Sequence, residues 1–348
     1  MKIYFFETDA TDEAVLRKLI DVNGAAGQII EAVFSSAPLN KEIANTAVDA
    51  DAVSIFTKSM VDAAVLEKLT KIKFIGVRAT GFDNIDLDVA ASRNIIVSNV
   101  PAYGSRTVAE FTFSLILGLS RKTFAATRQI KERHDFAIAD FEGFNLQGKT
   151  LGIVGTGRIG LNVAKIAKGF DMNVLGFDAF PNATAAKEIG FTYGDFDSVL
   201  AASDIISVHV PYMKTTHHLL NDAAFAKMKK GAILINTSRG EVIDTEALMR
   251  ALDAKIVSAA GLDVIEGERS LADEWSMSDR VGASEVFDSK AYKTMLEDHM
   301  LMDRPEVYIT PHIAFFSREA KQEILKTSAD NIAGFLKNAP INVVPQGH

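Results

Sequence analysis

The segment TLGIVGTGRIGLNVAKIAKGF, residues 150–170, constrains the fold of this chain more than any other stretch of its sequence. An apolar run leads into glycines at 155, 157 and 160, and a stretch with helical spacing follows at once. A strand that enters a helix through a G-x-G-x-x-G turn is typical of a parallel sheet with helices on its faces. The centre of the chain is therefore predicted to hold a β-α-β unit.

The same alternation of short apolar runs and helical patterns continues on both sides of this segment. On the N-terminal side, the pattern predicts strands at 2–6, 52–56 and 73–77 and a helix at 61–69. On the C-terminal side, it predicts strands at 173–178, 205–210, 232–237 and 257–264. A break at 100–106 precedes a predicted helix at about 107–121, and a helix at 321–336 closes the chain. We therefore expect the α/β class, with two doubly wound parallel-sheet domains.

Composition and charge exclude several classes of function. The chain has 348 residues, which is enough for two domains with sizeable cores. Its formal net charge of −8 repels the phosphate backbone of nucleic acids, so no nucleic-acid partner is expected. It has no cysteine, which excludes disulfides, thiolate catalysis and cysteine-ligated metals, and we expect no metal site.

The apolar stretches of the chain are too short for a signal peptide or a membrane-spanning helix. The apolar start of the sequence is interrupted at Glu7, whereas a signal peptide needs a longer apolar core. No uncharged stretch approaches the roughly 18 apolar residues of a membrane span. We therefore expect a soluble, cytoplasmic protein with no membrane partner. The polar stretch 269–305, which contains Trp275, is expected to be a solvated excursion with short helices.

The glycine turn predicts a site for a dinucleotide. The first glycine permits the tight turn, the second lets a pyrophosphate approach the backbone, and the third allows close packing of helix on strand. Asp178 ends the next strand, 178 − 160 = 18 residues after the last glycine. A carboxylate there can hold the ribose hydroxyls and repels a 2′-phosphate, and no Arg or Lys follows before Lys187, so we infer NAD. A glycine turn without a nucleotide, or a methyltransferase, would carry similar residues.

Arg239 lies in NTSRG, directly after the strand predicted at 232–237. Ligands of parallel sheets bind beyond the carboxyl ends of the strands. An arginine at such a position can hold a carboxylate with two parallel hydrogen bonds. The alternative for Arg239 is a surface or interdomain salt bridge.

His312 lies in TPHIAFF, directly after a proline that fixes φ and removes a backbone donor, so the histidine is expected on a stiff segment. The motif GLDVIEGE supplies Asp263, Glu266 and Glu268 after another predicted strand. A carboxylate beside a histidine stabilises the protonated ring and makes it a proton donor near neutral pH. The alternatives are a core histidine and acids that cap helices or face solvent, and for Glu266 we expect one of the latter.

These motifs supply an NAD site, an arginine for a carboxylate, an acid and a histidine, which together suit hydride transfer to a 2-oxo acid. The chain resembles the D-2-hydroxyacid dehydrogenase family over nearly its whole length. It carries, in family order, RATGFDNIDL, VPAYGSRTVAE, GKTLGIVGTGRIG, SDIISVHVPY, LINTSRGEVIDT, GLDVIEGE and TPHIAFF. Within the family, its motifs are most similar to those of members that act on D-lactate.

The resemblance implies a discontinuous, flavodoxin-like substrate domain, 1–101 and 310–348, and a Rossmann NAD-binding domain, 102–309. It implies reversible hydride transfer between NADH and pyruvate that gives D-lactate. A dehydrogenase for a bulkier D-2-hydroxy acid, such as phenyllactate or hydroxyisocaproate, and an NAD-sensing binding protein are the alternatives. The resemblance also implies a homodimer or higher homo-oligomer formed through the helix near 107–121.

The resemblance further implies a role for each site residue. Arg239 binds the substrate carboxylate and polarises the keto group, Glu268 partners the acid/base His312, and Asp263 supports that pair on the nicotinamide side. The expected cofactor-binding residues are Gly155, Thr156, Gly157, Arg158, Ile159, Gly160, Asp178, His209, Val210, Pro211, Thr237, Ser238 and Asp263. The expected substrate-binding residues are Phe56, Thr80, Gly81, Tyr103, Arg239, His312 and Phe315, with Thr80 and Gly81 offering backbone amides to the carboxylate.

Two positions depart from the family pattern. Many relatives have Ser-Pro after the tyrosine of PAY, where this chain has Gly104 and Ser105, and many have His where it has Phe111. Both positions lie near the hinge and its long helix, so interdomain or subunit packing is expected to differ. The candidates that line the side-chain pocket are large, which suits the small methyl group of pyruvate: Phe56, Met60, Tyr103 and Phe315.

Overall fold

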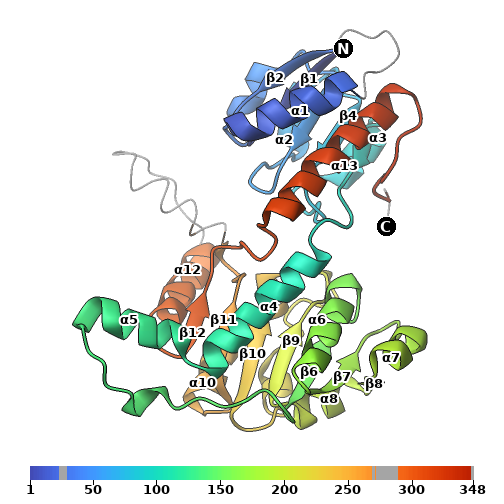
Figure 1. Ribbon diagram of the computed structural model, residues 1–348. Coiled ribbons are helices and arrows are strands. Elements are labelled where there is room, and N and C mark those ends of the chain that lie inside the picture. Colours follow the sequence, from blue (N-terminus) through green and yellow to red (C-terminus); the bar gives the residue numbers. More distant parts are fainter. Residues whose placement is uncertain (23–29, 269–270, 272–288, 346–348) are drawn as a thin grey trace. The chain divides into compact units, whose positions relative to one another are not determined.

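The computed structural model describes residues 1–22, 30–268, 271 and 289–345 (Figure 1). Trp275 and much of the polar stretch that begins at 269 lie outside the described residues. The chain divides into two compact units, of which the first comprises Met1–Tyr103 with Phe316–His348 and the second Gly104–Phe315. These boundaries lie a few residues from the expected ones. Within the described residues, no helix is both long and apolar enough to cross a membrane.

The first unit contains a five-stranded parallel sheet with the order β2-β1-β3-β4-β5. Its strands are β1 (Lys2–Phe5), β2 (Glu31–Phe34), β3 (Ala52–Ile55), β4 (Phe74–Val77) and β5 (Ile96–Ser98). Its helices are α1 (Ala10–Val22), η1 (Ile43–Ala47), α2 (Ala63–Lys68), α3 (Leu87–Ser92) and α13 (Arg318–Leu336). This strand order is that of flavodoxin-like sheets, which bind ligands beyond the carboxyl ends of their strands.

Side chains alternate between two apolar layers on the faces of this sheet. Val53 and Ile75 pack on one face, whereas Phe5 and Phe74 pack on the other with Ile332 of α13. The last helix therefore completes the core of the first unit, and Figure 1 shows it beside α1.

The second unit contains a seven-stranded parallel sheet with the order β12-β11-β10-β9-β6-β7-β8. Its strands are β6 (Thr150–Val154), β7 (Asn173–Phe177), β8 (Thr192–Tyr193), β9 (Ile205–Val208), β10 (Ala232–Asn236), β11 (Val257–Leu262) and β12 (Val307–Ile309). The chain runs from β6 outward through β7 and β8, and then returns to the other side of β6 at β9. The switch point between β6 and β9 is where such sheets bind a nucleotide.

Helices cover both faces of the second sheet (Figure 1). They are α4 (Ser105–Ser120), α5 (Thr123–Arg133), η2 (Ala139–Phe141), α6 (Arg158–Gly169), α7 (Ala183–Ile189), α8 (Phe196–Ala202), α9 (Asp222–Phe225), η3 (Gly240–Val242), α10 (Thr245–Asp253) and α12 (Ser289–Met302). Ile235 packs with Ile116 of α4 and Val163 of α6, whereas Leu234 packs on the opposite face with Leu248 of α10. The predicted α/β class with two parallel sheets is confirmed.

Candidate active site

The carboxyl edge of the seven-stranded sheet collects most of the predicted site residues. The strands β6, β7, β9, β10, β11 and β12 are followed directly, or within three residues, by Gly155, Asp178, His209, Thr237, Asp263 and His312. Since parallel strands end at one edge, residues that are far apart in the sequence share one side of the unit.

The glycine turn between β6 and α6 is closely packed at two of its three glycines. Gly155 has φ +95°, and a Cβ atom there would lie 2.7 Å from the carbonyl carbon of His209. A Cβ atom on Gly160 would lie 2.1 Å from the carbonyl oxygen of Gly155. A Cβ atom on Gly157 would meet nothing within 4 Å, and α6 begins at the next residue. The turn thus leaves open space at a helix N-terminus, which suits an incoming pyrophosphate.

Asp178 lies against this turn. Its Oδ2 accepts hydrogen bonds from the backbone N–H of Thr156 at 2.6 Å and from the Thr156 hydroxyl at 3.1 Å, and its Oδ1 accepts the N–H of Phe180 at 2.9 Å. The Thr156 hydroxyl also lies 2.8 Å from the hydroxyl of Tyr193 on β8. The carboxylate is therefore held at the turn, where a ribose attached to the pyrophosphate would reach it.

His209 forms part of a polar chain that runs behind the same edge. Its Nε2 lies 2.8 Å from the hydroxyl of Ser207, and its Nδ1 lies 3.5 Å from the hydroxyl of Thr237. The Thr237 hydroxyl lies 3.1 Å from that of Thr112 on α4. Burial lowers the pKa of His209 to about 3, so the ring is neutral and cannot serve as the proton donor. The next residue, Val210, is half-buried.

The NTSRG loop is braced by Asn236, a residue that the sequence analysis did not single out. Its Oδ1 accepts the backbone N–H of Ser238 at 3.0 Å and the Ser238 hydroxyl at 2.8 Å, and its Nδ2 donates to the Arg239 carbonyl at 2.8 Å. Asn236 is fully buried, whereas the side chains of Ser238 and Arg239 are only half-buried. The buried amide thus shapes the loop that presents Arg239. The sequence feature that could have indicated Asn236 is a polar residue at the end of an otherwise apolar strand.

His312 and Glu268 form the pair that the sequence predicts. His312 Nδ1 lies 3.0 Å from Glu268 Oε1, and both side chains are about one-third exposed, at 34% and 36%. His312 has φ +54°, an uncommon left-handed conformation for a histidine. Its backbone N–H donates to the carbonyl oxygens of Asp263 and Thr310, both at 2.9 Å. The imidazole is therefore held in one orientation, with its Nε2 edge away from the glutamate.

Asp263 holds the segment that carries this histidine. Its Oδ1 accepts the Thr310 hydroxyl at 2.5 Å and the N–H of Ile313 at 2.9 Å, and its Oδ2 accepts the N–H of Ala314 at 2.8 Å. Asp263 is only 1% exposed, and burial raises the pKa of its carboxyl. These contacts engage both carboxylate oxygens and hold the backbone on both sides of His312.

Glu266 does not behave as the sequence analysis expected. It was expected to cap a helix or to face solvent, and that expectation is wrong. Its Oε1 lies 2.9 Å from Nε2 of His218, and its Oε2 accepts the hydroxyl of Thr245 at 3.3 Å. The side chain is only 15% exposed, so it belongs to a buried polar network beside the turn that carries Glu268.

The predicted substrate residues lie in both units. In the second unit, the ring of Phe315 stands edge-on to that of His312, with centroids 6.2 Å apart. In the first unit, the Thr80 hydroxyl donates to the carbonyl of Val100 at 3.0 Å, which fixes the loop after β4. Phe56 follows β3, and its backbone N–H donates to Glu7 at 3.0 Å. Gly81 and Tyr103 are half-buried in the same unit.

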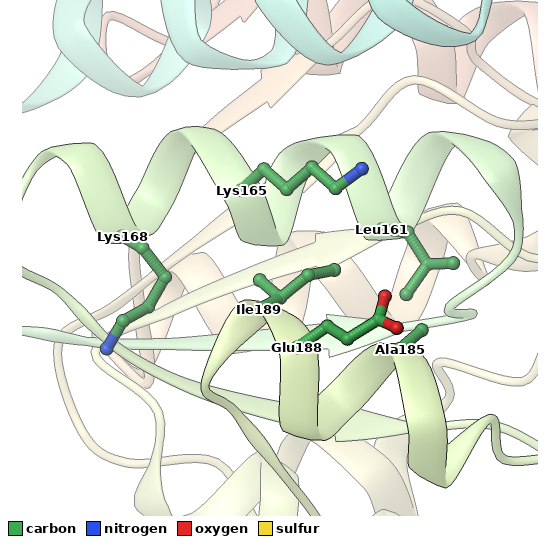
Figure 2. A pocket seen from close by; sticks show the side chains of 6 residues that line it. All are labelled: Leu161, Lys165, Lys168, Ala185, Glu188 and Ile189. Carbon is green, nitrogen blue, oxygen red and sulfur yellow. The ribbon is translucent and has the colours of Figure 1, made fainter.

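A shallow pocket of about 270 Å³ lies elsewhere, between α6 and α7 (Figure 2). It is lined by Leu161, Lys165, Lys168, Ala185, Glu188 and Ile189. None of the predicted site residues contributes to it. No group of three or more His, Asp or Glu side chains in the described part of the chain could hold a metal ion.

Comparison with known proteins places these features in a family. The model of the D-isomer specific 2-hydroxyacid dehydrogenase, NAD binding domain, matches residues 113–314. A D-lactate dehydrogenase of Curvularia clavata is 38% identical over 334 residues, 94% of this chain and 91% of that protein. The D-lactate dehydrogenase of Escherichia coli K12 is 35% identical over 339 residues, 97% of each chain. The structure of D-lactate dehydrogenase from Aquifex aeolicus, complexed with NAD and lactic acid, is similar with a TM-score of 0.83 and 31% identity, covering 97% of this chain and 96% of that one.

Proposed function

Since the chain belongs to the D-isomer specific 2-hydroxyacid dehydrogenase family and is an NAD-dependent oxidoreductase, we propose that its reaction is the reversible reduction of pyruvate to D-lactate. The observation that carries the proposal is the 3.0 Å contact of His312 with Glu268 at the same sheet edge as the glycine turn. One edge thus offers a proton donor and a dinucleotide site, which is what carbonyl reduction by hydride requires.

The glycine turn and Asp178 would hold the coenzyme. The open space at Gly157 admits the pyrophosphate to the N-terminus of α6, and Asp178 accepts hydrogen bonds from the ribose hydroxyls. NADH bound there supplies the hydride. His209, neutral and hydrogen-bonded, lines the site together with Val210, Pro211, Thr237 and Ser238 without adding charge.

Arg239, His312 and Glu268 would act on the substrate. Arg239 holds the carboxylate and draws charge from the neighbouring carbonyl. His312 donates a proton from Nε2 to the carbonyl oxygen, because its Nδ1 is engaged by Glu268. The negative charge of Glu268 stabilises the protonated ring, and the neutral ring accepts the proton in the reverse reaction. Backbone amides at Thr80 and Gly81 are proposed as further donors to the carboxylate.

The preference for pyruvate rests on the size of the side chains proposed to surround the substrate methyl group. Phe56, Tyr103 and Phe315 are aromatic and at least half-buried, and Met60 is partly exposed. Large side chains leave room for a methyl group and exclude longer ones. A bulkier 2-oxo acid is the alternative substrate.

We also propose that the chain forms a homo-oligomer and acts in the cytoplasm, as expected from the sequence. The segment after α5 carries two strongly exposed apolar side chains, Phe136 at 83% and Ile138 at 82%, which are favourable contacts for a second copy. Sedimentation equilibrium of the wild type and of Phe136→Ser tests this: a monomeric wild type contradicts the proposal.

The activity is tested by following NADH oxidation with pyruvate, phenylpyruvate and 4-methyl-2-oxopentanoate, and by determining the configuration of the product. We expect the highest kcat/KM with pyruvate and a product that is D-lactate. Tight NADH binding without turnover of any of the three acids would contradict the proposed function. A higher kcat/KM with a bulkier acid would contradict only the choice of substrate.

A further inference from the structure

The turn that carries Glu268 is clamped from several directions. It spans residues 265–268 and is closed by the N–H of Glu268, which donates to the carbonyl of Ile265 at 3.4 Å. The NTSRG loop packs against it so closely that a Cβ atom on Gly240 would lie 2.1 Å from the Ile265 carbonyl. Glu266 is held by His218 and Thr245, as described above. The position of the Glu268 carboxylate therefore depends on how this turn is held.

Asp298 of α12 holds the same turn from behind. Its Oδ2 accepts the backbone N–H of Gly267, the residue directly before Glu268, at 3.0 Å. A Cβ atom on Gly267 would lie 2.3 Å from that Oδ2 and 3.1 Å from Cγ2 of Thr294, so only glycine fits against the helix. Asp298 is 0% exposed, and its Oδ1 has no hydrogen-bond partner in the part of the chain that the structure describes. A buried polar atom without a hydrogen-bond partner is uncommon in folded proteins and is often found where the residue has a specific role.

Burial, more than the neighbouring charges, favours the neutral form of Asp298. Burial raises the pKa of its carboxyl to about 7, Glu266 and Glu297 add to the effect, and the Gly267 N–H and His299 oppose it. Lys293 of α12 forms salt bridges with Glu246 of α10 and with Glu297 of its own helix. A neutral carboxyl still accepts the Gly267 N–H. Below neutral pH, Asp298 therefore supplies mainly a hydrogen-bond acceptor rather than a negative charge.

We propose that Asp298 is a positioning residue: by accepting the Gly267 N–H, it fixes the turn from which Glu268 reaches His312. The inference rests on the proposed function for its catalytic consequence, whereas the holding of the turn is a property of the fold alone. Without the acceptor, a buried N–H loses its partner and the turn must shift to find another. Glu268 then orients the imidazole less well, although the glycine turn and its coenzyme site are unaffected.

Three variants of the full-length protein test this inference. Asp298→Asn keeps an oxygen that can accept the Gly267 N–H, and Asp298→Leu removes the acceptor at similar size. Met295→Ala is the matched control, because Met295 is buried on the same helix but belongs to the apolar core. For each variant, kcat and KM for pyruvate, the Kd for NADH, the melting temperature and hydrogen exchange at the Gly267 amide are measured.

We expect Asp298→Leu to lower kcat by about 5- to 150-fold, the equivalent of one unsatisfied buried group, with a smaller change in KM and an unchanged Kd for NADH. Exchange at Gly267 should accelerate in this variant. Asp298→Asn should keep kcat and the exchange rate at Gly267 near those of the wild type. Met295→Ala should lower the melting temperature but leave kcat near that of the wild type.

Wild-type kcat and wild-type exchange in Asp298→Leu would overturn the inference, and so would equal losses in the Asn and Leu variants. An equal loss of kcat in Met295→Ala would mean that any loosening of α12 has the same effect, which also overturns it. If the wild type reduces no 2-oxo acid, the proposed function has failed. The exchange data then decide separately whether Asp298 holds the turn.

Discussion

The two halves of the carboxyl edge of the second sheet are built by different means. The coenzyme half, after β6, β7 and β9, is shaped by glycines whose missing side chains let backbone segments approach each other. The acid half, after β10, β11 and β12, also has close approaches at Gly240 and Gly267, but buried polar side chains that accept backbone N–H groups hold its segments in place. In the coenzyme half, a glycine without a side chain leaves space for a ligand. In the acid half, buried hydrogen-bond acceptors hold the segments that carry the reacting groups.

This difference explains why the two halves should fail independently. Hydrogen bonds within the acid half connect Asp263 to the 310–314 segment and Asp298 to Gly267. The contact of 3.5 Å between His209 Nδ1 and the Thr237 hydroxyl joins the two halves, whereas the contacts of Asp263 and Asp298 given above involve no residue of the glycine turn. A substitution in the acid half is therefore expected to change turnover, and one in the coenzyme half to change coenzyme affinity.

The largest effect is expected from removal of the proton donor. His312→Ala should lower kcat for pyruvate reduction by about 10²- to 10⁴-fold, because general acid catalysis is lost. The Kd for NADH, measured by fluorescence titration, should stay within about twofold of the wild type, because the substitution removes no proposed contact with the coenzyme. A parallel loss of NADH affinity would show that the two halves are coupled.

Substitution of the carboxylate-binding residue should give the next largest effect. Arg239→Lys keeps the charge but loses the two-pronged geometry of the guanidinium. We expect kcat/KM for pyruvate to fall by about 10- to 150-fold, the cost of a charged hydrogen bond, mostly through KM. Steady-state kinetics with pyruvate at saturating NADH measure this. Near wild-type kinetics would mean that Arg239 is structural.

Asp178→Ala tests the coenzyme half in the same way. Loss of the charge-assisted hydrogen bonds to the ribose should weaken NADH binding by about 10- to 150-fold and narrow the preference over NADPH. The kcat at saturating NADH should change little, because His312 and Glu268 are untouched. The matched control is Asp195→Ala, whose carboxylate caps α8 in the same unit. A wild-type enzyme that used NADPH as readily as NADH would contradict the role of Asp178.

The smallest effect concerns the pH dependence of stability in the acid half. The pKa of Asp298 is raised from 3.8 to about 7 in the folded chain. The folded state therefore binds this proton more tightly than the unfolded state, and protonation of Asp298 stabilises the fold. That stability is fully present below about pH 4 and is lost as pH rises through about 7. The unfolding free energy of the wild type should therefore fall by about 2–3 kcal/mol relative to that of Asp298→Asn between pH 5 and pH 8. Urea denaturation at both pH values measures the difference, and a constant offset would contradict it.

The same comparison explains what could be predicted from the sequence. The glycine turn is local: GTGRIG and Asp178 lie within one β-α-β unit, so the motif, its strand and its helix were all readable together. The acid half depends on contacts across the chain, such as Asp263 with Ile313, 50 residues apart, and Gly267 with Asp298, 31 residues apart. No pattern of local spacing indicates such partners, and Asp298 was accordingly missed. Asn236 was missed although its partners lie only two and three residues away, at the end of an apolar strand.

Element prediction followed the same rule. Buried apolar runs were recognised as strands, but β2, β5, β8 and β12 were not predicted. Of these, β5, β8 and β12 have only two or three residues each. Glu266 was misjudged because its partner His218 lies 48 residues away. For Glu266 the missing information was tertiary rather than local.

Proton transfer by His312 is tested by the pH dependence of kcat/KM for pyruvate and for D-lactate, measured for the wild type and for His312→Ala. If His312 donates the proton in reduction and accepts it in oxidation, kcat/KM for pyruvate should fall with rising pH while that for D-lactate rises over the same range. Both slopes should disappear from the residual activity of His312→Ala, with the Kd for NADH constant throughout. Slopes that persist in His312→Ala would contradict the account, because another group would then carry the proton.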